Sequence, residues 1–231
     1  LTAEQLQRAA RLIASLEILR ISGLIISDVR IITGLYVGQG STPNTLKKLG
    51  EKIENSESLP LKDCPWCGTP LMNNVHNYKS TGQNKLLKCH SESCHFYQYE
   101  IPVYLCDEQI YKFREKPSLL FATVDKMATM AHKVETIGLF RDIDIIIQDE
   151  LHLLTGPLGS AVALFEKAFR EITARKKEKQ KLYPKVIAST ATSKNSKDQV
   201  NHLYGTDINI FPKPGLKCSD SWFASFERSA T

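Results

Sequence analysis

Apolar residues along the chain repeat with two periods, one typical of helices and the other typical of buried strands. Residues 2–20 open with the capping-box pattern Thr2-x-x-Gln5 and then carry an apolar side chain at each helical turn, which predicts an amphipathic helix. Short β-branched runs bounded by glycine, proline or polar residues predict strands. We therefore expect strands within 29–37, 118–123, 143–152, 185–188 and 208–211, and helices at 46–53, 127–134, 156–172 and 198–204.

The most apolar of these strands contains Ile145, Ile146 and Ile147 in succession. A continuous β-branched run is typical of a parallel strand that is covered on both faces. Strands and helices alternate along the chain, which predicts an α/β fold in which helices cover both faces of one parallel sheet. The charged run 175–181 follows the predicted helix 156–172, and we expect it to be a solvated tail beside the helix C-terminus.

Polar and charged groups follow three of the predicted strands, at 123–126, 148–152 and 189–192. Since the carboxyl ends of parallel strands share one edge of a sheet, we expect these groups to line one cleft. Asp149 and Glu150 are adjacent carboxylates, a pair suited to nucleotide hydrolysis, because one can hold Mg²⁺ through its waters while the next polarises the attacking water. The alternative is a salt-bridged pair without a catalytic role.

A glycine-containing turn, Gly38-Gln39-Gly40-Ser41, follows the strand predicted within 29–37 and leads through Thr42 and Pro43 into the next helix. Such a turn presents free N–H groups at a helix N-terminus, and these favour a phosphate oxygen. A plain strand-to-helix turn is the alternative interpretation.

The helix and strand periods break between residues 59 and 106, where four cysteines fall in two close pairs. Two residues separate Cys64 from Cys67 and four separate Cys89 from Cys94, which is the spacing of metal ligands. Four thiolates around one Zn²⁺ form a closed tetrahedral site that stabilises a fold and leaves no open position for a catalytic water. Disulfide bonds are the alternative.

The composition limits the classes of protein to which the chain can belong. The chain has 231 residues, of which 42% are hydrophobic and 24% are charged, as in an ordinary globular protein. Its formal net charge of +5 permits a nucleic-acid partner without demanding one. The sequence has neither a transmembrane stretch nor a signal-peptide layout, so we expect a cytoplasmic protein without a membrane partner. We also expect the lone cysteines Cys106 and Cys218 to be reduced.

Several short strings resemble the motifs of one enzyme class. Asp149-Glu150-Leu151-His152 resembles motif II of superfamily 2 helicases, and Thr190-Ala191-Thr192 resembles their motif III. Thr123-Val124-Asp125-Lys126 is similar to motif Ib, and the first five residues are similar to the tail of motif Ia. Within this superfamily, the strings Cys-Pro-Trp-Cys-Gly and Phe-Pro-Lys-Pro-Gly most resemble the large helicase component of the DISARM anti-phage system.

The resemblance covers nearly the whole chain and implies a RecA-like motor domain of an ATP-dependent helicase in bacterial anti-phage defence. Its expected partners are nucleic acid, with DNA expected and RNA left open, and other defence proteins. It implies that Asp149 binds the Mg²⁺ of ATP, that Glu150 activates water and that His152 reports nucleotide state to motif III, residues Thr190, Ala191 and Thr192. It also implies sequence-independent contacts with phosphates, for which the candidates are Thr2, Gln5, Ser41, Thr42, Thr123, Asp125 and Lys126.

The chain departs from the helicase pattern because it contains no Gly-x-x-x-x-Gly-Lys-Ser/Thr loop. The resemblance places that loop upstream of residue 1 and a second motor domain after residue 231, so we expect an excerpt that is inactive by itself. We expect RecA-like parts at 1–58 and 107–211, a zinc-ribbon insertion at 59–106 and a linker at 212–231. The alternatives are a zinc-ribbon module that binds nucleic acid or protein on a non-hydrolysing scaffold, and a degenerate helicase-like domain.

Overall fold

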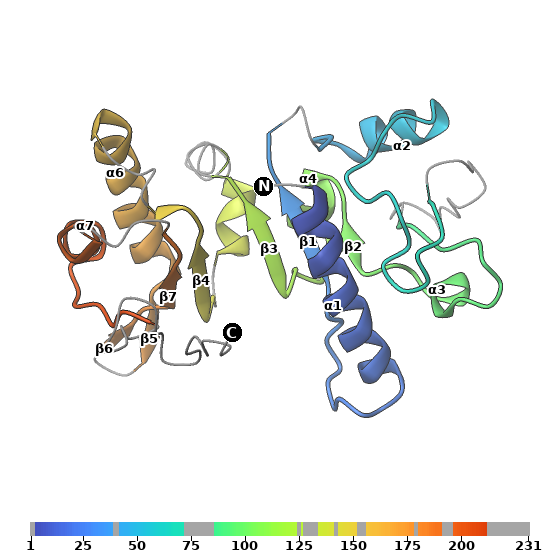
Figure 1. Ribbon diagram of the computed structural model, residues 1–231, viewed down its shortest axis with the longest axis horizontal. Helices are drawn as coiled ribbons and strands as arrows, with labels where there is room; N and C mark the ends of the chain where they lie inside the picture. The colour runs from blue at the N-terminus through green and yellow to red at the C-terminus, as the bar shows by residue number, and fades with distance from the viewer. Residues whose placement is uncertain are drawn as a thin grey trace, which may run out of the picture. The chain divides into compact units, whose positions relative to one another are not determined.

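The computed structural model of the protein describes residues 3–38, 42–71, 86–123, 126, 134–140, 143–151, 156–177, 180–190 and 196–211. The chain divides into two compact units, Leu1–Arg141 and Asp142–Thr231, whose helices and strands are labelled in Figure 1. Each unit combines helices with parallel strands, so the fold class is α/β. None of the described helices is long and apolar enough to cross a membrane.

The central strand of the first unit is β1 (Thr33–Tyr36), which pairs in parallel with β2 (Val103–Tyr104) on one side and with β3 (Leu119–Ala122) on the other. Thr33 faces both Val103 and Leu119, so the two ladders begin at the same level. β1 is shorter than the strand predicted within 29–37. The reason is that the N–H group of Ile31 donates to the Glu17 carboxylate at 2.9 Å instead of to a neighbouring strand.

Two helices cover opposite faces of β1. On one face, α1 (Ala3–Ile21) buries Leu6, Ala10 and Ala14 in the same core as Leu35 and Val37. On the other face, Ile110 of α4 (Asp107–Lys112) and Pro117, which follows that helix, lie close to Gly34. A Cβ atom at position 34 would be 3.3 Å from Ile110 Cγ1 and 2.9 Å from Pro117 Cγ. Successive residues of a strand point to opposite faces, so the glycine at position 34 allows α4 to pack on the face opposite α1.

The cysteine-containing segment shares the hydrophobic core of the first sheet. α2 (Leu46–Glu54) contributes Leu49 to this core, and α3 (His95–Gln98) contributes Phe96, together with Leu61 and Ile101 from the connecting segments. All of them are buried in one cluster with Leu6 of α1. The described residues of the segment 59–106 therefore share the core of the first unit, and the predicted bounds of the insertion stay a prediction. A 3-10 helix, η4 (Val134–Leu139), follows later in this unit.

The second unit contains a parallel pair formed by β4 (Ile145–Gln148) and β7 (Lys185–Ala188), with Ile145 opposite Lys185. α6 (Gly156–Thr173) and α7 (Ser196–Tyr204) pack against each other. The helices predicted at 2–20, 46–53, 156–172 and 198–204 are thus confirmed as α1, α2, α6 and α7, whereas the helix predicted at 127–134 lies almost entirely outside the described residues.

Several predictions about this unit were wrong. Residues 175–177 and 180–182 do not form a tail, because they are the antiparallel strands β5 (Arg175–Lys177) and β6 (Gln180–Leu182). Residues 208–211 form no strand. The described strands are ordered β2-β1-β3 in the first unit and β4-β7 and β5-β6 in the second, and one parallel sheet across the chain stays a prediction.

The Ile145–Ile147 run is also not covered on both faces, since Ile145 is 54% exposed and Ile147 is 69% exposed. Val186 of β7, opposite Ile146 in the ladder, packs against buried Leu151 and Tyr204, as do Ala163 of α6 and Val200 of α7. Because side chains alternate along a strand, the neighbours of Ile146 and Val186 face away from these helices.

Candidate functional site

Two tight turns carry the four cysteines. In the first, the Cys64 N–H donates to the Thr69 carbonyl at 2.8 Å and the Gly68 N–H donates to the Cys64 carbonyl at 3.0 Å. Gly68 has a φ of +75°, a left-handed conformation that glycine adopts without steric cost. In the second turn, the Cys89 N–H donates to the Phe96 carbonyl at 2.9 Å, which closes the chain around Cys94. Local hydrogen bonds therefore shape both turns.

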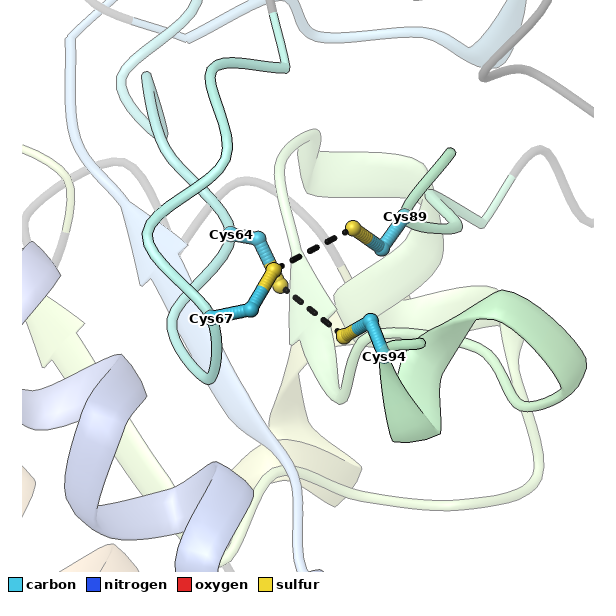
Figure 2. A group of neighbouring side chains, drawn as sticks. All are labelled: Cys64, Cys67, Cys89 and Cys94. Atoms are coloured by element: carbon cyan, nitrogen blue, oxygen red, sulfur yellow. Dashed lines mark hydrogen bonds between the residues drawn. The ribbon is translucent and has the colours of Figure 1, made fainter. Parts of the chain in front are cut away.

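The four sulfur atoms converge between these turns, as Figure 2 shows. All lie within 4.8 Å of one another, with 3.7 Å between the Sγ atoms of Cys64 and Cys94 and 3.5 Å between those of Cys67 and Cys89. A tetrahedron with Zn–S bonds of about 2.3 Å has sulfur–sulfur edges of about 3.8 Å. The thiols are free, so the disulfide alternative is excluded for these residues. The cluster fits a metal such as zinc, and the predicted ligand set is brought together.

The protonation of the thiols differs within the cluster. Burial raises the pKa of Cys64 above its ordinary value and raises the pKa of Cys94 to about 11. Burial also acts to raise the pKa of Cys67, but hydrogen bonds from Thr69, Cys89 and Cys94 outweigh it and lower that pKa to about 6. A metal that binds thiolates must displace the protons held by Cys64 and Cys94.

The carboxylate of Asp149 is held at the end of the β4–β7 pair. Gln148 faces Ala188 in the ladder, so Asp149 and Ser189 follow their strands at the same level. The Ser189 hydroxyl donates to Asp149 Oδ1 at 2.5 Å, and the Ser189 N–H donates to the Gln148 carbonyl at 2.9 Å. The Asp149 carboxylate is exposed to solvent but fixed in direction.

Glu150 adopts a left-handed backbone conformation with a φ of +53°. This conformation is unfavourable for a residue with a Cβ atom. It is stabilised by the Glu150 N–H, which donates to Asp149 Oδ1 at 3.0 Å, and by the Leu151 N–H, which donates to the Ser189 carbonyl at 2.9 Å. Strained backbone of this kind concentrates at functional sites, which makes the tip of β4 a candidate site on structural grounds as well.

Ser189 has a part in this site that the sequence patterns did not assign. The sequence placed it at a strand end with Thr190, but the motif resemblance began at Thr190. Its position as the first residue after β7, in register with Asp149, was the available signal. Thr190 is exposed beside it, whereas His152, Ala191 and Thr192 lie outside the described residues.

Two of the proposed nucleic-acid contacts are engaged inside the first unit. Lys126 is 9% exposed, and its ammonium group donates to Asp107 Oδ2 at 2.5 Å and to Asn44 Oδ1 at 3.4 Å. The same group lies 5.0 Å from the centre of the Tyr36 ring. Thr42 is fully buried, and its hydroxyl donates to the Val37 carbonyl at 3.1 Å. Contact of these two side chains with nucleic acid stays a prediction.

The donors at the start of α2 are also satisfied internally. The Leu46 N–H donates to the Glu108 carboxylate at 2.6 Å, and the Lys48 N–H donates to the Thr45 hydroxyl at 3.2 Å. Both bonds occupy donors at the start of α2, whereas residues 39–41 of the predicted phosphate turn lie outside the described residues, so a phosphate site there stays a prediction. Among the other candidates, Gln5 is exposed and Thr123 is partly buried, while Thr2, Ser41 and Asp125 lie outside the described residues.

A pocket of about 960 Å³ lies within the second unit, between β7, α6, α7 and residues 206–211. Its wall includes Ser189 and Glu166, whose pKa is raised by burial, but it includes neither Asp149 nor Glu150. The pocket is mostly apolar. The carboxylate pair therefore lies outside the pocket wall, which its neighbours Leu151 and Ser189 help to form.

No protein-family model matches the chain. The chain is 32% identical to the DISARM protein DrmA of Bacillus paralicheniformis over 97% of its own length, and it spans 24% of the length of that relative. Among solved structures, it is similar to the DUF1998 helicase MrfA bound to DNA, with a TM-score of 0.36 and 17% identity, over 78% of this chain and 20% of that chain.

Proposed function

We propose that this homologue of the DISARM protein DrmA is a segment of an ATP-dependent nucleic-acid motor, with a RecA-like arrangement of its parallel strands. The observation that carries the proposal is the tip of the β4–β7 pair, where the Ser189 hydroxyl fixes Asp149 and the strained backbone of Glu150 follows directly. A carboxylate held in one direction next to a second carboxylate suits metal-assisted hydrolysis of a nucleotide.

The two carboxylates have different roles in this proposal. Asp149 would hold Mg²⁺ through coordinated waters, because Oδ1 already accepts two hydrogen bonds and the carboxylate is therefore fixed as an ion ligand. The bound ion neutralises charge on the ATP phosphates. Glu150 is exposed and would orient and polarise the attacking water. Thr190 follows Ser189. It would couple the nucleotide state to the nucleic-acid contacts, together with His152, Ala191 and Thr192.

The cysteine cluster has a structural role in the same proposal. We assign Zn²⁺ to Cys64, Cys67, Cys89 and Cys94, because thiolates are the ligands that zinc prefers at closed tetrahedral sites. Cys64, Cys89 and Cys94 are buried in the core shared with α1 and β1. The ion would therefore stabilise the first unit and take no part in hydrolysis.

The expected partner is nucleic acid, most simply the DNA of a phage. The net charge of +5 suits a polyanion, and the relative is named as a component of DISARM. Contacts with phosphates would be independent of sequence. Other proteins of the same defence system are the second class of proposed partner, and the cytoplasm is the proposed site of action.

Substitution of the carboxylates in the full-length protein tests the proposal. Asp149→Asn and Glu150→Gln are each expected to abolish nucleic-acid-stimulated ATP hydrolysis while the circular dichroism spectrum stays that of the wild type. Asp144→Asn is the matched control, because Asp144 is an exposed carboxylate that precedes the same strand and pairs with Arg175 at 2.9 Å. Undiminished hydrolysis in the first two variants would contradict the proposal and favour a non-hydrolysing scaffold.

A further inference from the structure

The cysteine-containing segment exposes aromatic rings but buries its aliphatic side chains. Trp66 is 47% exposed, Tyr97 is 39% exposed and Tyr99 is 44% exposed. Among the described residues of this segment, the large aliphatic side chains are at most 7% exposed, namely Leu59, Leu61, Leu71, Leu86, Leu87 and Ile101. The segment therefore has a core that buries its aliphatic side chains. The large apolar side chains that its described residues leave exposed to solvent are aromatic.

Three of the exposed rings lie next to one another, and we call Trp66, His95 and Tyr99 the aromatic surface. The Trp66 and His95 rings are 6.3 Å apart and tilted by 67°, and the His95 and Tyr99 rings are 6.4 Å apart and tilted by 47°. Trp66 lies between Cys64 and Cys67, and His95 follows Cys94. The cysteine cluster that joins the two turns therefore also assembles the aromatic surface.

A cation is held at the backbone of the residue that precedes Tyr99. The Lys88 ammonium donates to the Gln98 carbonyl at 2.8 Å, and Gln98 is the residue before Tyr99. Lys88 makes no ion pair with any residue in the described part of the chain. Its positive charge is thus available to an anionic ligand next to Tyr99.

We propose that the aromatic surface binds single-stranded nucleic acid, with bases stacked on Trp66 and Tyr99 and a phosphate on Lys88. Every base offers a π-face, so exposed rings beside a cation are the usual means of holding a single strand without regard to sequence. A duplex hides these faces. Aromatic rings are also common at protein–protein interfaces, but lysine is depleted there, so the Lys88 ammonium, which has no ion-pair partner among the described residues, favours a polyanionic strand over a protein. The proposal concerns the first unit and does not depend on ATP hydrolysis.

The test is fluorescence anisotropy of the full-length protein with labelled oligodeoxythymidine, in the absence of ATP. The double variant Trp66→Ala, Tyr99→Ala is expected to bind about 5-fold or more weakly for each stacked base that is lost. The double variant Trp66→Phe, Tyr99→Phe should retain most of the affinity, because phenylalanine keeps the stacking face. Tyr183→Ala is the matched control, since Tyr183 is 38% exposed and lies in the second unit. Zinc content measured on each variant shows that the cluster is intact.

Wild-type affinity in the alanine variant would overturn the proposal and indicate another use for the surface, such as contact with a protein. Photo-cross-linking of the wild-type protein to oligodeoxythymidine that carries iodouracil tests the same point without substitutions. Cross-links at Trp66 or Tyr99 are expected, and cross-links confined to other segments would overturn the proposal even if the variants fail to fold. The same measurements with oligouridine distinguish RNA binding from DNA binding. ATP hydrolysis influences neither the anisotropy nor the cross-linking measurement.

Discussion

The hydroxyl of Ser189 donates to Oδ1 of Asp149 at 2.5 Å, although the two residues are separated by 40 positions in the sequence. They meet because β4 and β7 are adjacent and parallel, with Gln148 opposite Ala188. The same Oδ1 atom accepts the Glu150 N–H at 3.0 Å. The proposed metal ligand, the proposed water-activating residue and the end of β7 thus form one hydrogen-bonded unit.

Ser189→Ala is expected to lower kcat for ATP hydrolysis by about 10-fold or more, because one hydrogen bond to a charged carboxylate contributes about 1.5–3 kcal/mol. The loss arises from a less well oriented Asp149, so steady-state ATP hydrolysis by the full-length protein is the measurement. Ser189→Thr retains a hydroxyl and serves as the control. A kcat equal to the wild type in the alanine variant would show that this bond does not orient Asp149.

Glu150→Gly is expected to stabilise the protein by up to about 1 kcal/mol while it removes the proposed hydrolytic group. The reason is the left-handed φ of +53° at this position, which glycine adopts without steric strain. Urea unfolding measures the difference. Glu150→Gln, which keeps the Cβ atom, should remove hydrolysis without the gain in stability, and a destabilised glycine variant would contradict the strain argument.

Metal analysis of the purified protein is expected to find about one zinc ion per chain. Zinc affinity should rise with pH, because burial raises the pKa values of Cys64 and Cys94 and both thiols must lose protons to bind the ion. Cys64→Ser should lose the metal, whereas Cys106→Ser should retain it, since Cys106 lies outside the four-cysteine cluster. A soluble, folded and metal-free wild-type protein would contradict the assignment.

Lys126→Met is expected to destabilise the protein by about 3–5 kcal/mol, because it leaves the fully buried Asp107 carboxylate without its cation. The double variant Asp107→Asn, Lys126→Met should recover much of this loss, and a double-mutant cycle in urea measures the coupling. This result would assign Lys126 a structural role. A Lys126→Met variant of unchanged stability but weaker nucleic-acid binding would instead support the contact that the motif resemblance implies.

Glu17→Gln is expected to lower the free energy of unfolding by about 1.5–3 kcal/mol near neutral pH. Burial acts to raise the pKa of Glu17, but hydrogen bonds from Arg20 and the Ile31 N–H, with the charges of Arg20 and Arg30, lower it below the ordinary value of 4.5. A lowered pKa means that this stabilisation is present above pH 4.5 and is lost as the pH falls through the folded-state pKa.

Urea unfolding between neutral and acidic pH checks the sign of this effect. The stability of the wild type should decline more steeply toward acid than that of Glu17→Gln, and the two should converge at the lowest pH. Glu54→Gln is the control, because Glu54 is exposed on α2. Parallel pH curves for the wild type and Glu17→Gln would contradict the role assigned to this carboxylate.

Local patterns in the sequence were sufficient for four of the helices and for the cysteine quartet that the structure brings together. The apolar period of residues 2–20 predicted α1, and the close spacing within each cysteine pair predicted a set of four metal ligands. The carboxylates Asp149 and Glu150 were found because they follow an apolar run directly. Each of these features depends on residues a few positions apart, whose geometry is set by backbone conformation and local hydrogen bonds.

The sequence by itself determined the α/β class, the cysteine quartet and the carboxylate pair, whereas the tertiary structure alone decided their surroundings. Ser189 meets Asp149, and Lys126 is buried against Asp107, because strand pairing and helix packing join distant segments. The pairing of β5 with β6 replaced an expected tail, although the paired residues, such as Lys177 and Gln180, are close in sequence. The β-branched character of Ile145 and Ile147 could not reveal their exposure, because exposure depends on which elements pack against a strand, and that is not encoded in the strand's own residues.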